Sequence, residues 1–242
     1  MFIYRKLSTN EVALTVCFTA LYVVFGFLKI SPIIGLPGQA ITAAAIIAPI
    51  IGIILGPYIG TLSTFFGGIV GFFFGSFSPL SFVSGIFAAL CSGLTYNKKR
   101  ISSIVVYLSL FLFFAFYPIV GPVWLFPATI WFQIIVFFIL LSPLQSAALR
   151  DFNSEKDGKL LIAFFITTLT STLAGQIAGS LTLELIQMPD VNYFKGTWES
   201  ITFLYPIERI IIALSAAFIG ASLTKVLKSA NIMPNFMQKH LE

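Results

Sequence analysis

The chain has 242 residues, of which 58% are hydrophobic, 16% are aromatic and only 10% are charged. Soluble domains are typically about 25% charged, so a water-soluble fold would have too few charges to cover its surface. In a bilayer the outer surface must be apolar, and the mean hydropathy of +0.98 agrees with that solvent. Composition therefore predicts an integral membrane protein, and the net charge of +5 is better explained by membrane topology than by nucleic-acid binding.

Three long segments contain no charged residue and no histidine: 30–97, 101–149 and 160–183. A spanning helix needs about 20 apolar residues, so these segments have room for several spans, which Pro and Gly residues divide. We predict helices over about 11–30, 40–55, 57–74, 80–96, 102–117, 123–144, 159–187 and 200–228. Ser8 and Glu11 have the spacing of a capping box at the start of the first, and Pro57 is tolerated at the first position of the third. The predicted fold class is an all-α integral membrane protein, with a single transmembrane domain over 1–242 and a polytopic helical bundle of about eight transmembrane helices.

The charges between the predicted spans are distributed unevenly. Eight spans place both ends of the chain on one side of the membrane. That side would carry eleven cations, namely Arg5, Lys6, Lys98, Lys99, Arg100, Arg150, Lys156, Lys159, Lys225, Lys228 and Lys239, against Lys29 and Lys195 on the other side. Because cytoplasmic loops are enriched in Lys and Arg, we expect a multi-pass protein of the cell membrane with the N-terminus and the C-terminus in the cytoplasm. We expect the first helix to remain, because no small-residue cleavage site follows a short apolar region.

Small residues recur every four positions in several of the predicted spans. The rows are Gly52, Gly56 and Gly60, then Gly67, Gly71 and Gly75, then Gly175 and Gly179, and finally Ala213, Ala217 and Ala221. Such rows allow helices to approach closely in lipid. Packing within the molecule is the ordinary interpretation, and docking of a partner is the alternative.

The sequence lacks the patterns of soluble enzymes. No cluster of His, Cys and carboxylate residues has the spacing of metal ligands, no Walker-type phosphate loop is present, and no nucleophile–base set is visible. We therefore expect no enzyme activity and no cofactor or metal, and a process driven by ATP would need its ATPase on another chain. The sparse charge within the spans disfavours a proton-coupled carrier.

Polar and aromatic residues gather toward the predicted outer side. Trp124 and Trp131 are seven apart, as on one helical face, and Glu184 and Gln187 are three apart and share a face. We predict a substrate site between the loop 31–38, the start of the sixth helix and the end of the seventh. Its candidate residues are Gln39, Trp124, Trp131, Gln176, Glu184, Gln187, Lys195, Glu199 and Glu208. The alternatives are a membrane-edge role for the aromatic residues, headgroup solvation for Glu184 and interhelical hydrogen bonding for Gln176.

Glu208 and Arg209 place two charges within a predicted span, where each costs about 3 kcal/mol on insertion scales. In one interpretation Pro206 starts the final helix, so that Glu208 lies near its positive N-terminal end and Arg209 reaches the outer interface. In the other, the pair has a role in a binding site or in gating.

Residues 12–96 resemble the S components of energy-coupling factor (ECF) transporters, which are small membrane proteins that capture vitamins. The resemblance rests on Ala20-Leu21-Tyr22-Val23-Val24, on Pro37-Gly38, and above all on Leu55-Gly56-Pro57-Tyr58-Ile59-Gly60 followed by Gly67-Gly68 and Gly71. The segment Tyr205-Pro206-Ile207-Glu208 is also similar to many members. S components have six spans, whereas the pattern here predicts eight.

The resemblance implies a substrate-capture subunit that binds a small water-soluble nutrient from outside. A coupling membrane subunit and two ATPase subunits would then drive its release inward, and residues 31–38 would form the loop that covers the site. Ala13, Cys17 and Ala20 would dock the coupling subunit. The family docks through an Ala-x-x-x-Ala signature on its first helix, and Ala13-x-x-x-Cys17 is the nearest match to that signature here. A scaffold subunit of a larger membrane complex and a secondary carrier are the alternatives.

Overall fold

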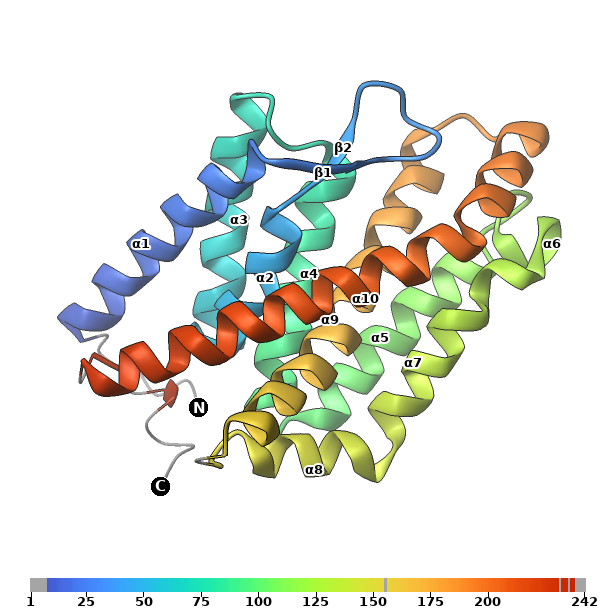
Figure 1. The fold of residues 1–242 in the computed structure, drawn as a ribbon. Helices are drawn as coiled ribbons and strands as arrows, with labels where there is room; N and C mark the ends of the chain where they lie inside the picture. Colours follow the sequence, from blue (N-terminus) through green and yellow to red (C-terminus); the bar gives the residue numbers. More distant parts are fainter. Residues whose placement is uncertain (1–7, 155, 231, 235, 238–242) are drawn as a thin grey trace, which may run out of the picture.

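The computed structural model describes residues 8–154, 156–230, 232–234 and 236–237. Most of this part of the chain is helical (Figure 1). The elements in chain order are α1 (Thr9–Gly26), β1 (Lys29–Pro32), β2 (Ala40–Thr42), α2 (Ala44–Leu55), α3 (Pro57–Phe73), α4 (Pro79–Tyr96), α5 (Arg100–Ala115), α6 (Pro122–Leu125), the 3-10 helix η1 (Pro127–Ile130), α7 (Trp131–Leu141), α8 (Pro143–Asp151), α9 (Asp157–Ile186) and α10 (Val191–Ser229).

The N-terminal end of α1 has the predicted capping box. The Ser8 side chain accepts a hydrogen bond from the Glu11 N–H at 3.2 Å, and the Glu11 carboxylate accepts one from the Ser8 N–H at 3.0 Å. These two bonds satisfy amide donors that have no partner within the helix. Helix α1 ends at Gly26, four residues before the predicted end.

Residues 29–42 form a β-hairpin between α1 and α2, where the sequence analysis places the end of one helix and the start of the next. Strands β1 and β2 pair antiparallel, with Lys29 opposite Thr42 and Pro32 opposite Ala40. Gly35 and Gly38 both have positive φ values, +89° and +80°, which only glycine adopts at low cost. The helices predicted over 11–30 and 40–55 are therefore too long at this junction, and the chain contains a small sheet beside its helices.

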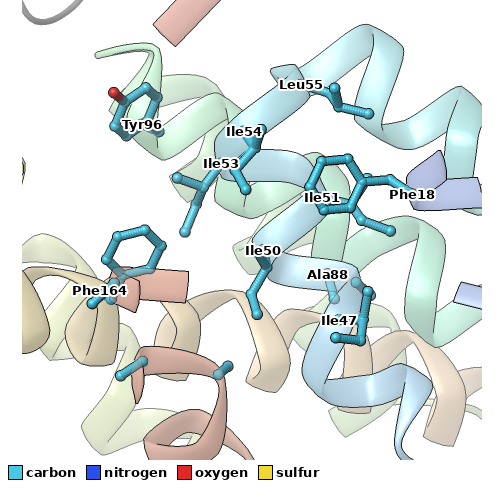
Figure 2. Close-up of a cluster of buried hydrophobic side chains, with 14 of the residues drawn as sticks. Phe18, Ile47, Ile50, Ile51, Ile53, Ile54, Leu55, Ala88, Tyr96 and Phe164 are labelled. Atoms are coloured by element: carbon cyan, nitrogen blue, oxygen red, sulfur yellow. The ribbon is translucent and has the colours of Figure 1, made fainter. Parts of the chain in front are cut away.

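Helices α2 and α3 are separated by a single residue, as predicted. Gly56 has a φ of +85° and Pro57 occupies the first position of α3. Figure 2 shows that isoleucines point from α2 in several directions, toward Phe18 of α1, Tyr96 of α4 and Phe164 of α9. Ile50, Ile51 and Ile53 are completely buried, so α2 is enclosed by other helices rather than by lipid.

The segment predicted as one helix over 123–144 is divided into α6, η1, α7 and α8. Pro122, Pro127 and Pro143 each begin one of these helices, because proline lacks the N–H that would continue a preceding helix. The axis turns by 63° between Pro127–Leu141 and α8. Arg100 holds this corner, since its guanidinium donates hydrogen bonds to the Leu140 and Ser142 carbonyls, both at 2.8 Å.

Helix α10 continues through Pro206, so the final helix does not restart there. The final helix begins at Val191, nine residues before its predicted start, and the Asp190 side chain caps it. Proline cannot donate to the Thr202 carbonyl four residues earlier. The indole Nε1 of Trp131 donates to that carbonyl instead, at 3.0 Å, which satisfies a backbone group that would be costly to leave unpaired in a membrane.

Helix α9 lies at the centre of the bundle and contacts α4, α10, α8 and α5. Its close approach to α4 depends on Gly175, where a Cβ atom would lie 2.5 Å from the Ser84 carbonyl oxygen. A Cβ at Gly52 would likewise overlap the Ala89 carbonyl. These two glycines therefore pack helices of the same chain together, which is the ordinary interpretation of the small-residue rows.

Several helices have the length and composition of membrane spans. Helices α1, α4, α9 and α10 are each long and apolar enough to cross a bilayer, and the bent segment from Pro127 to Asp151 is a fifth candidate. The apolar helices α2, α3 and α5 are shorter; α2, with 12 residues, is about 18 Å long, less than the ~30 Å hydrocarbon core. The fold is thus that of an all-α, multi-pass membrane protein, while eight spans stay a prediction.

The two ends of the bundle differ in charge. The hairpin and α6 lie at one end, and α8, the start of α1 and the end of α10 lie at the other (Figure 1). The α8 end carries Lys98, Lys99, Arg100, Arg150, Lys156, Lys159, Lys225 and Lys228, whereas the hairpin end carries Lys29 and Lys195. Arg5, Lys6 and Lys239 lie outside the described residues.

A cavity beneath the hairpin as candidate functional site

A cavity lies beneath the β-hairpin, where five helices meet. Its lining comes from the hairpin and its flank (Ile33, Ile41, Thr42), α1 (Tyr22), α2 (Ala45, Ala48), the turn before α4 (Phe77), α4 (Leu80, Ser81, Ser84, Gly85, Ala88), α9 (Thr172, Gln176, Gly179, Ser180) and α10 (Tyr205, Arg209). Its volume is about 60 Å³, whereas a single water needs roughly 10–15 Å³. It therefore has room for a small cluster of atoms and is smaller than a vitamin-sized molecule.

One wall of the cavity is aromatic. The Tyr22 and Phe77 rings stack with their centroids 5.0 Å apart, and Tyr22 is only 1% exposed. The Tyr22 hydroxyl lies against the Cα of Gly85, so closely that a Cβ there would overlap it. The absence of a side chain at position 85 thus makes space for the tyrosine at the edge of the cavity.

The opposite wall carries the strongest hydrogen-bond donors. Arg209 of α10 is 5% exposed, and its guanidinium carbon lies 5.8 Å from the centroid of the Tyr205 ring. Its Nε has no hydrogen-bond partner in the described chain, and neither has Nε2 of Gln176, which is also 5% exposed. Buried donors without partners are costly, and these two face one cavity from adjacent helices.

The hairpin is held over the cavity by contacts with α10. The Tyr193 hydroxyl donates a hydrogen bond to the Gly35 carbonyl at the turn of the hairpin. A Cβ at Gly35 would lie 2.9 Å from that hydroxyl and 3.2 Å from Oγ1 of Thr197. The turn therefore fits closely against the first turns of α10.

Of the predicted site residues, only Gln176 lines the cavity. Glu184 and Glu208 are 2% and 7% exposed, and their carboxylate oxygens have no hydrogen-bond partners in the described chain, but neither belongs to the lining. The remaining residues lie outside it: Gln39, Lys195 and Glu199 are exposed, and Gln187 is partly exposed at the end of α9.

Trp124 and Trp131 do not share a helical face, because Trp124 lies in α6 and Trp131 begins α7. The Trp124 ring is 59% exposed and contacts Phe116, with 5.9 Å between the ring centroids. Trp131 bonds to the α10 backbone as described above. Neither residue lines the cavity.

Sequence reasoning missed most of the cavity's polar lining. Thr172, Gln176 and Ser180 are spaced by four residues and follow one face of α9, and Ser81 and Ser84 are three apart on α4. This helical spacing of hydroxyl and amide side chains was the available signal. Tyr22 and Tyr205 occur in the segments that carry the family resemblance, and Arg209 had been singled out for its charge.

The lining residues suit binding rather than catalysis. They offer a guanidinium, an amide and several hydroxyl groups beside apolar side chains, the mixture typical of small-molecule sites. No group of three or more His, Cys, Asp or Glu residues with the geometry of a metal site occurs in the part of the chain that the structure describes.

The predicted docking residues lie on the outside of α1. Ala13, Cys17 and Ala20 are all exposed, and spacings of four and three residues place them on one helical face. Most of α1 is exposed to its surroundings. Its outer face is therefore available to lipid or to a partner.

No family model, curated protein or solved structure matches this chain.

Proposed function

We propose that this protein is the substrate-capture subunit of an ECF-type importer, which binds a vitamin-like small molecule from outside the cell. The observation that carries the proposal is the cavity beneath the hairpin, into which Gln176 and Arg209 bring buried donors without partners. A scaffold subunit has no need of such groups, because they oppose folding unless a ligand or water satisfies them.

The charge distribution supports binding from outside. The hairpin end carries few cations and the α8 end carries many, a distribution that under the positive-inside rule favours an outer position for the hairpin and its cavity. The hairpin would open toward the extracellular solution, admit the ligand and close over it.

The exposed face of α1 supports a partner. Capture alone does not move a solute against a gradient, and the sequence has no ATP-binding motif. Ala13, Cys17 and Ala20 present small side chains, which allow the helix of another subunit to approach closely. In this proposal a coupling membrane subunit docks there and two ATPases drive release into the cell.

The test of capture is a thermal-shift screen of the purified full chain against water-soluble vitamins. A ligand at 100 times its dissociation constant stabilises the folded state by about 2.7 kcal/mol, which in a chain of this size raises the melting temperature by several degrees, at roughly 2–4 °C per kcal/mol. We expect one chemical class to give a saturable shift. A panel without any saturable shift contradicts the proposal.

The test of partner docking is co-purification with the coupling subunit and ATPases after co-expression. We expect Ala13→Trp to reduce the recovered complex, because the bulky ring prevents close helix packing. Val105→Trp on α5 is the control, since Val105 is 56% exposed on another helix. Equal recovery of both variants and the wild type would rule out docking through this face of α1.

A further inference from the structure

The cavity beneath the hairpin contains one charged residue. Of the eighteen residues that line it, Arg209 alone carries a formal charge, and the other polar residues are neutral hydroxyl or amide side chains. The walls are otherwise apolar, with Ile33, Ile41, Phe77 and Leu80 among them. A guanidinium remains protonated in proteins, so the cavity presents a positive charge to whatever occupies it.

No acidic side chain of the described chain forms an ion pair with Arg209. Glu208 precedes it, but adjacent helical residues point about 100° apart. The described ion pairs, Lys159–Asp151 and Lys225–Asp157, include neither residue. Both Glu208 oxygens lack hydrogen-bond partners, and Glu208 does not line the cavity. The Tyr205 ring centroid lies 5.8 Å from the guanidinium carbon, and the guanidinium Nε has no hydrogen-bond partner in the described chain.

An unpaired charge 95% removed from solvent within a membrane bundle is expensive and is expected to have a counterion in the functional state. Carboxylates match the planar donor fork of arginine, which binds them through two parallel hydrogen bonds. The Gln176 amide, whose Nε2 is unpartnered, supplies a further donor from α9. Donors from α9 and α10 together with apolar lining residues fit a ligand that has an acidic group on an apolar body.

We infer that the ligand of this cavity is a small organic carboxylate and that Arg209 binds its acidic group. The inference rests on the proposed capture function and specifies its substrate class. Cationic vitamins and neutral amides are then excluded, because they leave the guanidinium without a counterion.

The experiment compares acids with their uncharged counterparts on the purified full chain. Four pairs are used: nicotinate and nicotinamide, biotin and biotinamide, lipoate and lipoamide, and pantothenate and panthenol. We expect at least one acid to bind, and its neutral partner to bind roughly 10- to 150-fold more weakly, the range for a lost hydrogen bond to a charged group. This comparison uses the wild type, so it does not depend on the folding of any variant.

Variants then assign the preference to Arg209. Arg209→Gln is expected to remove the preference for the acid over its neutral partner, and Arg209→Lys, which keeps the charge but not the planar donor fork, is expected to retain part of that preference. Arg150→Gln at the α8 end is the control and should bind as the wild type does. An acid preference that persists in Arg209→Gln overturns the assignment.

The remaining outcomes separate this inference from the proposed function. If the vitamin screen yields only a neutral or cationic ligand and none of the four acids binds, the inference fails and capture stands. If no compound of either set binds, both fail.

Discussion

At the scale of single residues, the cavity depends on glycines, which have no side chain, as well as on the polar side chains that line it. Gly85 and Gly179 line it without side chains, and Tyr22 occupies the space over Gly85. Protein interiors are otherwise closely packed, so a concentration of small residues beside unpartnered donors is a specific arrangement.

Gly85→Ala tests this arrangement. The added methyl group overlaps the Tyr22 hydroxyl and must displace the ring from its stack on Phe77. Overpacking of this kind costs about 1–3 kcal/mol, so we expect a lower melting temperature and weaker ligand binding. Gly196→Ala on α10 is the matched control, because a Cβ there meets no atom within 4 Å. Equal binding by the two variants would show that the ligand lies elsewhere.

The candidate residues show how far a sequence reveals a site. Gln176 was predicted correctly as a deep polar residue of α9, because amides in apolar segments require partners. Glu184 was predicted from the face that it shares with Gln187, and Glu208 from its charge within a span and from the resembling segment. The direction in which each side chain points depends on helix rotation, which the sequence does not specify. Trp124 and Trp131 were grouped on one face of a single helix, but Pro127 lies between them and begins a separate 3-10 helix, so that assumption was wrong.

At the scale of elements, the β-hairpin was not predicted: the sequence predicted a loop over 31–38 but no strands on either side of it. Pro32, Gly35, Pro37 and Gly38 disfavour a helix over this segment and permit a turn. The boundary between α2 and α3 at Gly56-Pro57 was predictable, because the effect of glycine and proline on the backbone is local and does not depend on contacts with other elements. The pairing of β1 with β2 depends on contacts between strands, which local composition does not specify.

Tyr193→Phe tests whether the hairpin controls ligand release. The substitution removes the hydrogen bond to the Gly35 carbonyl and leaves the ring in place. One such bond contributes about 0.5–1.5 kcal/mol, so we expect the bound ligand to dissociate roughly 2- to 12-fold faster. Tyr58→Phe is the control, since the Tyr58 hydroxyl has only a 3.5 Å contact with Lys99 at the other end of the bundle. Unchanged dissociation in Tyr193→Phe would argue against a gating role for this contact.

A second prediction concerns the packing of α9 on α4. A Cβ at Gly175 would lie 2.5 Å from the Ser84 carbonyl oxygen, whereas one at Gly179 would lie 3.3 Å from the Leu80 carbonyl oxygen. Backbone atoms cannot move aside as side chains do, so Gly175→Ala should force the two helices apart. We expect it to lower the melting temperature of the purified protein clearly more than Gly179→Ala does. A larger decrease in melting temperature for Gly179→Ala than for Gly175→Ala would contradict the close approach of α9 to α4 at Gly175.

At the scale of the whole molecule, the fold combines enclosed and exposed helices. Helix α2 is buried on all sides, and α9 is largely buried, while α1 is mostly exposed. Helix α10, with 39 residues, is about 58 Å long, nearly twice the thickness of the ~30 Å hydrocarbon core. It runs obliquely across the bundle (Figure 1), so it must tilt in the bilayer or extend beyond it.

Lys195 and Lys228 provide a direct test of topology, because both are exposed and lie toward opposite ends of α10. Each is replaced by cysteine in a chain whose Cys17 and Cys91 have been changed to serine. We expect a membrane-impermeant maleimide to label position 195 on intact cells and position 228 only after permeabilisation. Labelling of both positions on intact cells would mean that α10 does not cross the membrane as proposed.

The central claim is that this chain alone captures one solute molecule and does not transport it. The most direct measurement is retention of a radiolabelled ligand from the vitamin screen by liposomes that contain only the purified protein. The account predicts that retention saturates at one ligand for each protein molecule whose cavity faces the solution. It also predicts that retention is independent of the internal volume of the vesicles and is weaker in Gly85→Ala. Accumulation that grows with internal volume would identify a secondary carrier and contradict the account, and so would the absence of saturable retention, as expected of a scaffold subunit.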